Sequence, residues 1–369
     1  MQMQNKISFG RWEAVTLLIN VICTKLFLYY TRLTVEDAGT AGWIMTVYIS
    51  LIVVVIYTVM IKFYKKFESK DILDIAEFTG GKLLKIITGL LITSILFYST
   101  TAVLREFSED MKVVSLPSSP LSYIMIFFII GVVAGSYLGI EAILRYHAII
   151  VPIIATGYVI ILLGAIPQMD LTNILPIMGN GVNSIFGKGA FRITAYGELM
   201  LIFLLSPFLG SYKNVRSTGY IAIAFSSVFL IAGSLAYILT YPYPTSLESF
   251  LPIYQMARLI NLGKFFQRVE AVFVFIWAMA AFIYLTATFY FMVYAFSKTA
   301  GLKYMRPLIF PFAILVFSAA FIPENLMEVI HAESQYFRKI GWLIIFAFIF
   351  IILAIARLRK KADKERLDR

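Results

Sequence analysis

The sequence predicts an all-α integral membrane protein with ten transmembrane helices, on the basis of its composition, its long apolar runs and the placement of its charges. Hydrophobic residues make up 60% of the 369 positions and charged residues 14%, against about 45–50% and about 25% in soluble domains. A soluble chain of this length cannot bury so much apolar surface, which excludes a soluble enzyme, a disordered protein and a disulfide scaffold. The runs are also too continuous for a membrane β-barrel, whose strands alternate.

The first five spans are apolar runs of roughly 20 residues, the length that a helix needs to cross the hydrocarbon core. The first lacks a small-residue cleavage site and is expected to be retained. Gly131, Gly135 and Gly139 repeat every four residues in the fourth, which predicts close helix packing. At the start of the fifth, Glu141 and Arg145 are spaced for a structural ion pair on one helix face. The five spans lie at about 12–30, 41–61, 83–104, 120–138 and 142–166.

The last five spans lie at about 191–211, 217–241, 267–296, 306–322 and 339–356. The eighth is long enough to be strongly tilted. On the outside, residues 248–260 are expected to form a short helix over the bundle. On the inside, residues 71–78 carry apolar positions at helical spacing and predict an interfacial helix. A basic tail, 359–369, ends the chain, and residues 357–361 are expected to contact anionic lipid, with docking of a partner as the alternative.

The charges orient the predicted bundle. With the N-terminus cytoplasmic, about twice as many Lys and Arg residues fall on the inside as on the outside, so both termini are expected to be cytoplasmic. This topology accounts for the net charge of +11 without any nucleic-acid partner. The loops are short, so residues 1–369 are expected to form a single transmembrane domain.

Catalytic and metal-binding motifs are missing from the sequence. Gly179-Asn180-Gly181 lacks both the third glycine of a dinucleotide fingerprint and the Lys-Ser/Thr of a phosphate loop. The two histidines, His147 and His331, lie far apart without metal-ligand spacing, and the single cysteine, Cys23, permits no internal disulfide. We therefore expect neither an enzyme nor a bound cofactor.

Two charges inside predicted spans are the strongest functional signal, because such charges are costly and default to functional roles. Lys25 lies seven residues inward of Arg32, about 10 Å at helical rise, and Glu198 lies six residues inward of Arg192, about 9 Å. Their depths therefore match. One interpretation is that Lys25 extends outward along its flexible stem to the membrane surface. The other is that Lys25 pairs with Glu198, or that both bind a zwitterionic ligand, which offsets their desolvation.

Small and polar residues, including Thr24 and Gly197, flank these two charges. Interrupted helices at corresponding places in two halves of a chain are typical of transporter binding sites. The two halves would be inverted five-helix repeats at about 11–166 and 191–358. The first span contains no glycine, so its interruption is inferred from the charge. Hydroxyl groups in spans three and eight, among them those of Tyr98 and Tyr284, either bond to neighbouring helices or line a pocket.

Three stretches of this sequence resemble the B subunits of spore germinant receptors (GerA-type receptors), within the amino acid–polyamine–organocation superfamily. The resemblance covers essentially the whole chain, in length and in the order of its motifs. The stretches are Leu104-Arg105-Glu106-Phe107-Ser108 followed by Leu116-Pro117 and Pro120-Leu121, Gly139-Ile140-Glu141 with Arg145, and Phe266-Gln267-Arg268-Val269-Glu270 with Trp277.

The resemblance implies a LeuT-like fold of five-plus-five inverted repeats in the inner membrane of a dormant bacterial spore. It implies nutrient sensing, of amino acids or sugars, together with an A subunit and a lipoprotein C subunit. The family commonly has a glycine-containing break in span one, whereas this chain has Lys25, which could replace a coupling cation. The ligand site implied among spans one, three, six and eight consists of Thr24, Lys25, Tyr98, Gly197, Glu198 and Tyr284.

Three functions stay open from the sequence. The first is a germinant-sensing subunit whose ligand shifts the population of two bundle conformations. The second is a working secondary transporter for amino acids. The third is a channel-forming subunit, although the sequence has no charged ring or filter motif. One cation and one anion suit a zwitterionic amino acid, while sugars and nucleosides are alternatives.

Overall fold

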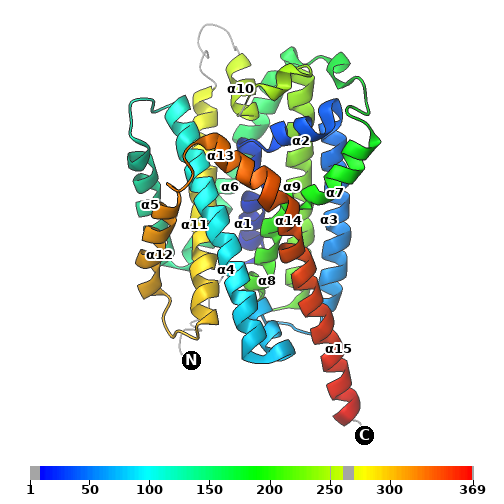
Figure 1. Ribbon diagram of the computed structural model, residues 1–369, viewed down its shortest axis with the longest axis vertical. Helices are drawn as coiled ribbons and strands as arrows, with labels where there is room; N and C mark the ends of the chain where they lie inside the picture. Colours follow the sequence, from blue (N-terminus) through cyan, green and yellow to red (C-terminus); the bar gives the residue numbers. More distant parts are fainter. Residues whose placement is uncertain (1–8, 250, 261–269, 368–369) are drawn as a thin grey trace.

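The computed structural model describes residues 9–249, 251–260 and 270–367, and within them all regular secondary structure is helical (Figure 1). The α-helices are α1 (Arg11–Cys23), α2 (Tyr30–Ala38), α3 (Gly42–Tyr64), α4 (Ile72–Val114), α5 (Leu121–Leu138), α6 (Ile140–Ala165), α7 (Gly189–Phe191), α8 (Leu201–Leu209), α9 (Tyr212–Thr240), α10 (Pro252–Leu259), α11 (Glu270–Thr299), α12 (Arg306–Ala319), α13 (Leu326–His331), α14 (Arg338–Trp342) and α15 (Ile349–Leu367).

Eight helical segments in the described part of the chain are long and apolar enough to cross a membrane. Two further predicted spans correspond to α1, which ends early, and to the shorter apolar helix α12. The predicted start of the eighth span, at residue 267, lies outside the described residues. The eight segments are Tyr30–Tyr64, Ile72–Val114, Leu121–Leu138, Ile140–Gln168, Asn183–Leu209, Tyr212–Thr240, Glu270–Thr299 and Ile340–Lys361.

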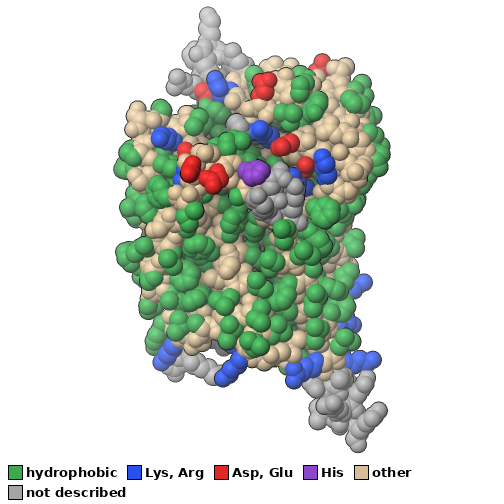
Figure 2. All heavy atoms as spheres, in the orientation of Figure 1, with side chains coloured by type: hydrophobic (Ala, Val, Ile, Leu, Met, Phe, Trp, Pro, Cys, Tyr) green, Lys and Arg blue, Asp and Glu red, His purple; other side chains and the backbone are tan. Residues whose placement is uncertain are grey.

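The surface of the bundle is divided into an apolar middle and charged ends. Figure 2 shows hydrophobic side chains over the middle of one face, with Lys and Arg gathered at the lower end and charges of both signs at the upper end. This is the distribution expected of a protein that spans a membrane. The lower end in Figures 1 and 2, where α15 ends and the α3–α4 link lies, is called the basal end below.

The beginning of α4 is helical where the sequence predicts a short interfacial helix at residues 71–78. Asp71 caps it by accepting hydrogen bonds from the backbone amides of Leu73 and Asp74. The backbone then leaves helical geometry at Gly80 and Gly81, and Gly81 has a φ of +71° that favours glycine. The kink separates a short helix at the basal end from the membrane-crossing part of α4.

The other end of α4 extends ten residues beyond the predicted limit at residue 104. The apolar run ends there because of a charged stretch, but the helix continues since its charges have partners. Arg105 bonds to Glu109 one turn later and donates to the Ala320 carbonyl beyond α12. This extension brings Glu106, which is 1% exposed, into the bundle.

Several smaller predictions agree with the structure. Gly131 and Gly135 of α5 face α11 closely, so that an added Cβ would clash with Phe282 or Thr286, which confirms the packing prediction for these two glycines. Gly139 follows the end of α5 at a φ of +89°, and an added Cβ there would meet nothing within 4 Å, so the prediction is wrong for the third glycine. Glu141 and Arg145 form the predicted ion pair at 2.5 Å, with largely exposed side chains. The expected outer helix at 248–260 is shorter, because α10 begins at a proline in its first turn; residue 250 lies outside the described residues.

The basic C-terminal stretch, for which the sequence predicts contact with anionic lipid, makes contacts with its own chain. Arg357 donates to the Lys62 carbonyl at the end of α3. Arg359 donates to the Thr79 carbonyl at the end of the short helix in α4 and lies over the Phe78 ring. Cations at these carbonyl ends complement the helix dipoles. The end of α15 therefore fastens the α3–α4 link to the bundle.

Candidate functional site

The first helix is interrupted at the depth of Lys25. α1 ends at Cys23, a 3₁₀ turn η1 (Thr24–Phe27) follows, and Leu28 leaves helical geometry at φ −101° and ψ −138°. The chain resumes as α2 at Tyr30. The Asn20 carbonyl accepts from both the Thr24 backbone amide and the Thr24 hydroxyl, the latter at 2.8 Å. The chain is thus broken here without any glycine.

The sixth predicted span is irregular at the matching place. After a π-helical turn and α7, residues 192–200 form a 3₁₀ helix, η6 (Arg192–Met200), which is kinked at Tyr196 (φ −106°, ψ 21°) before α8 continues. The Tyr196 hydroxyl bonds to Ser50 at 2.7 Å and Ser227 at 2.8 Å, which fixes the kink against α3 and α9. The helix is therefore interrupted where the sequence predicts an interruption, by a tighter 3₁₀ winding and a kink.

Lys25 and Glu198 meet between these two irregular segments. The Lys25 Nζ lies 2.6 Å from Glu198 Oε2 and donates to the Ala195 carbonyl at 2.7 Å. The Tyr284 hydroxyl of α11 donates to Glu198 Oε1 at 3.3 Å. The two charged side chains are only 6% and 12% exposed. Their pairing offsets the desolvation that either charge would suffer alone, and it shows that Lys25 does not extend outward to the membrane surface.

A small cavity of about 20 Å³ adjoins this ion pair, with room for about one water molecule. Five of the six residues predicted for the ligand site line it: Thr24, Lys25, Tyr98, Glu198 and Tyr284. The structure therefore brings together side chains from α4, α11 and both irregular helices. A molecule larger than water requires the surrounding side chains to move.

Gly197 is the predicted site residue that does not line the cavity. A Cβ added to it would lie 3.0 Å from the Ile345 side chain, which belongs to a π-helical segment, η9 (Leu343–Phe348). Gly197 therefore serves a close helix contact beside the site, and its neighbour Glu198 provides the polar group.

Ten further residues line the cavity that the sequence did not indicate for the site, and Glu106, Glu333 and Phe337 are three of them. Glu106 was quoted only as part of the family motif, and the predicted span stopped two residues before it. Glu333 and Phe337 lie on a π-helical segment, η8 (Ala332–Phe337), in a region interpreted as an outer loop. The Phe337 ring packs on Tyr98 with centroids 4.6 Å apart. Single π-helical turns are frequent at functional sites, but no pattern in the sequence indicated this one.

A second ion pair joins the same two interrupted helices farther from the basal end. Arg192 Nε lies 2.6 Å from Asp37 Oδ2 of α2, and the two side chains are 11% and 13% exposed. Arg192 Nη1 also donates to the Ser334 carbonyl at 3.0 Å. This guanidinium connects α2, η6 and η8, and η8 is the segment that carries Glu333 and Phe337.

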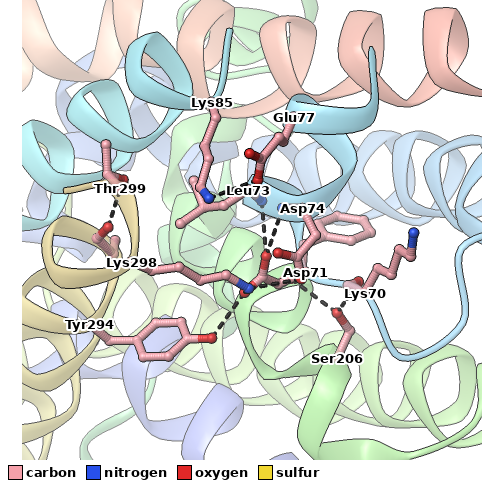
Figure 3. A network of polar contacts seen from close by, with 12 residues as sticks. Lys70, Asp71, Leu73, Asp74, Glu77, Lys85, Ser206, Tyr294, Lys298 and Thr299 are labelled. Carbon is pink, nitrogen blue, oxygen red and sulfur yellow. Dashed lines mark hydrogen bonds and ion pairs between the residues drawn. The ribbon is translucent and has the colours of Figure 1, made fainter. Parts of the chain in front are cut away.

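The basal end is tied together by a polar network centred on Asp71 (Figure 3). Asp71 Oδ2 accepts from Lys298 at 2.6 Å and from the Tyr294 hydroxyl at 2.9 Å, both on α11. Lys298 also bonds to Asp74 at 2.8 Å. Ser206 of α8 donates to a backbone carbonyl of the α3–α4 link. The network fastens α4, α8 and α11 together on the basal side of the cavity.

The described residues contain no cluster of three or more His, Cys, Asp or Glu side chains that could hold a metal ion. The chemistry of the site is therefore that of one ammonium group, nearby carboxyl groups, aromatic rings and hydroxyl groups. Such a set can bind a small polar molecule by charge and hydrogen bonding.

Comparison with known proteins identifies the family. The family described as "Spore germination protein" matches residues 9–329. Spore germination protein KB of Bacillus subtilis (strain 168) is 23% identical over 342 residues, which cover 89% of this chain and 90% of the relative. Spore germination protein B2 of the same strain is 22% identical over 198 residues, 54% of each chain.

The fold is similar to those of solved membrane transporters. MhsT in complex with L-phenylalanine aligns with a TM-score of 0.61 at 15% identity, over 94% of this chain and 88% of that one. A substrate-bound, outward-open Na⁺-coupled sialic acid symporter gives 0.60 at 12% identity, over 94% and 79%. The nucleobase-cation-symport transporter Mhp1 gives 0.58 at 9% identity, over 88% and 74%.

These similarities show a LeuT-like transporter fold. The family match extends over most of the sequence. This chain therefore belongs to the spore germination protein family, as a multi-pass membrane protein of the germinant-receptor B subunit type.

Proposed function

We propose that this chain senses a nutrient germinant, an amino acid, in the cavity between the first, third, sixth and eighth predicted spans. The observation that carries the proposal is the buried Lys25–Glu198 pair between two irregular helices. An amino acid presents a carboxylate and an ammonium group, so it can bond to both members of the pair. Tyr98, Thr24 and Tyr284 surround the same space and supply further hydrogen bonds.

Ligand binding in this proposal selects a wider conformation of the bundle. The cavity of about 20 Å³ is too small for an amino acid, and the Tyr98 and Phe337 rings, which pack at an angle of 31°, form part of its wall. A ligand that binds only the widened state shifts the population toward that state. Because Phe337 lies on η8, widening the cavity displaces a segment at the outer end, which gives a signal that a partner subunit can detect.

The test is a thermal-shift screen of the twenty amino acids on the purified protein. A ligand specific to the native state stabilises it by about 2.7 kcal/mol at 100 times its dissociation constant. We expect at least one amino acid to raise the unfolding temperature of the wild type and of the control Glu141→Gln, whose ion pair lies on the surface. The paired variant Lys25→Met/Glu198→Gln should lose the shift. A shift of unchanged size in the paired variant would contradict the proposed pocket.

The second candidate function is secondary transport of an amino acid, and the similarity to solved symporters favours it. Lys25 then occupies the position of a coupling cation. Proteoliposomes containing only this protein distinguish the two functions, because a transporter accumulates labelled amino acid inside the vesicle. Binding without uptake supports the sensor.

The proposal includes a specific topology and assembly. We infer ten spans in one transmembrane domain, as inverted repeats at about 11–166 and 191–358, with both termini cytoplasmic in the inner membrane of the spore. The B subunit would assemble with an A subunit and a lipoprotein C subunit. The single cysteine makes the topology testable: in a Cys23→Ser background, cysteines introduced at Gln2 and Asp368 should react only with a membrane-permeant maleimide. Copurification with the A and C subunits tests the assembly.

A further inference from the structure

A larger cavity, of about 220 Å³, lies between α5, α6 and α11, and shares no lining residue with the cavity beside Lys25. Its walls are mainly apolar, with Ala134 and Leu138 on α5 and with Phe282 and Ile283 on α11. For comparison, an engineered protein cavity of about 150 Å³ admits benzene. This cavity therefore has room for a small organic molecule without rearrangement of its walls.

The rim of this cavity is an apolar surface of the bundle. Leu138 and Tyr146, which line it, are 63% and 50% exposed. Neighbouring positions on α5, such as Ile130, also expose large apolar side chains. Because α5 and α6 are membrane-crossing segments, this surface contacts hydrocarbon. A molecule that enters from this side must be apolar enough to dissolve in the bilayer.

His147 provides a polar group in the wall. Its side chain is 1% exposed, and its Nδ1 lies 2.7 Å from the Ile143 carbonyl oxygen one turn earlier on α6. A carbonyl oxygen only accepts, so Nδ1 carries the proton in this bond. The other ring nitrogen, Nε2, has no hydrogen-bond partner among the described residues.

The neutral ring leaves Nε2 as a hydrogen-bond acceptor. The residues that line the cavity include no carboxylate that could stabilise an imidazolium, and an isolated buried charge is costly. Thr286, another polar residue of the wall, already donates its hydroxyl to the Phe282 carbonyl at 2.8 Å. Nε2 is therefore available to accept a hydrogen bond from a donor carried by a molecule in the cavity.

We propose that this cavity binds a small uncharged apolar molecule with one hydroxyl group, an alcohol or a phenol, which enters from the lipid and donates to His147 Nε2. Its aliphatic or aromatic body fills the space between α5, α6 and α11. The site is separate from the proposed germinant pocket, although α11 contributes to both: Tyr284 faces Glu198, while Ile283 and Thr286 face this cavity.

The test compares tritiated 1-naphthol with tritiated naphthalene, which lacks the hydroxyl group, on the protein in nanodiscs after subtraction of binding to empty nanodiscs. We expect 1-naphthol to bind the wild type about three- to tenfold more tightly, the factor that one net hydrogen bond contributes. In His147→Phe, which keeps a ring but removes the acceptor, the two probes should bind with equal affinity.

A matched pair of variants on α5 locates the binding. Ala134→Phe fills the rim of the cavity and should lower the affinity of the protein for both probes at least tenfold. Ile130→Phe places the same ring one turn away on the exposed surface, outside the cavity. This variant should bind both probes with the affinity of the wild type. Equal affinity of the two probes for the wild type would overturn the proposal, and so would unaltered binding to Ala134→Phe. The α5 pair decides the outcome even if His147→Phe does not fold.

Discussion

Two ion pairs join the same interrupted helices at two depths, and their charges are reversed. At the inner position the cation, Lys25, lies on the first helix and the anion, Glu198, on the sixth. At the outer position the anion, Asp37, lies on α2, which follows the break in the first predicted span, and the cation, Arg192, lies on η6. Both pairs are 2.6 Å long, and all four side chains are at most 13% exposed.

The surroundings of the two pairs differ more than their geometry. Lys25 and Glu198 border a cavity, and a hydroxyl from α11 reaches Glu198. The Arg192 guanidinium instead divides its donors between Asp37 and a backbone carbonyl of η8. In the proposed sensor, the inner pair therefore presents charges to a ligand, whereas the outer pair holds η8, which contributes Glu333 and Phe337 to the cavity wall.

The largest expected effect is that of breaking the inner pair. Lys25→Met leaves the Glu198 carboxylate buried without its cation, and removal of one partner of a buried pair typically costs about 3–5 kcal/mol. The unfolding free energy, measured by SDS titration in mixed micelles, should fall by that amount. Lys25→Met/Glu198→Gln removes both charges and should recover most of the loss. A paired variant as unstable as the single one would show that stability depends on the lysine itself rather than on charge compensation.

Breaking the outer pair should lower the unfolding free energy by a similar amount and should have a specific effect on η8. Arg192→Gln removes charge-assisted hydrogen bonds, each worth about 1.5–3 kcal/mol, and releases the Ser334 carbonyl. Amide hydrogen exchange in residues 332–337 should then increase. The matched variant Asp37→Asn keeps the bond from Arg192 to Ser334 and should leave that exchange unchanged. Equal exchange in the two variants would contradict the proposed role of Arg192 in holding η8.

The inner pair was predictable from the sequence because depth in a membrane can be counted along a helix. Lys25 and Glu198 lie at similar distances from the outer cations Arg32 and Arg192, and a buried charge requires a partner. The 3₁₀ turn after Cys23 carries no glycine or proline signal, so only the lysine indicated it. These predictions rest on local costs that a single residue type reveals.

The rest of the site depends on long-range packing and was not predictable. Glu106 enters the bundle because the partners of Arg105 allow α4 to continue past the apolar run. Glu333 and Phe337 reach the cavity through a π-helical turn, which has no sequence signature. Gly197 was expected at the ligand, but its closest contact is Ile345, a residue of a distant segment.

Removal of the hydroxyl that reaches the inner pair should have a modest effect. Tyr284→Phe deletes the donor to Glu198 Oε1, and the bond of 3.3 Å is near the long limit of hydrogen bonding. We expect a loss of about 0.5–1.5 kcal/mol in unfolding free energy, measured as for Lys25→Met. In the Lys25→Met background the same substitution should cost more, since Tyr284 is then the remaining described donor to the carboxylate. Strictly additive losses would show that the two donors act independently.

Breaking the exposed ion pair on α6 should have the smallest effect on the unfolding free energy. The comparison shows that burial determines how much the other two ion pairs contribute. Glu141 and Arg145 lie 2.5 Å apart, as close as the buried pairs, yet their side chains are 37% and 60% exposed. Solvent already compensates each charge, and pairs of this kind on a helix contribute about 0.3–0.5 kcal/mol. Glu141→Gln should therefore lower the unfolding free energy by no more than that, and 1 M salt should abolish the difference from wild type by screening. A loss of unfolding free energy comparable to that of Lys25→Met would mean that the distance between the charges, rather than their desolvation, determines how much each of the three ion pairs contributes to stability.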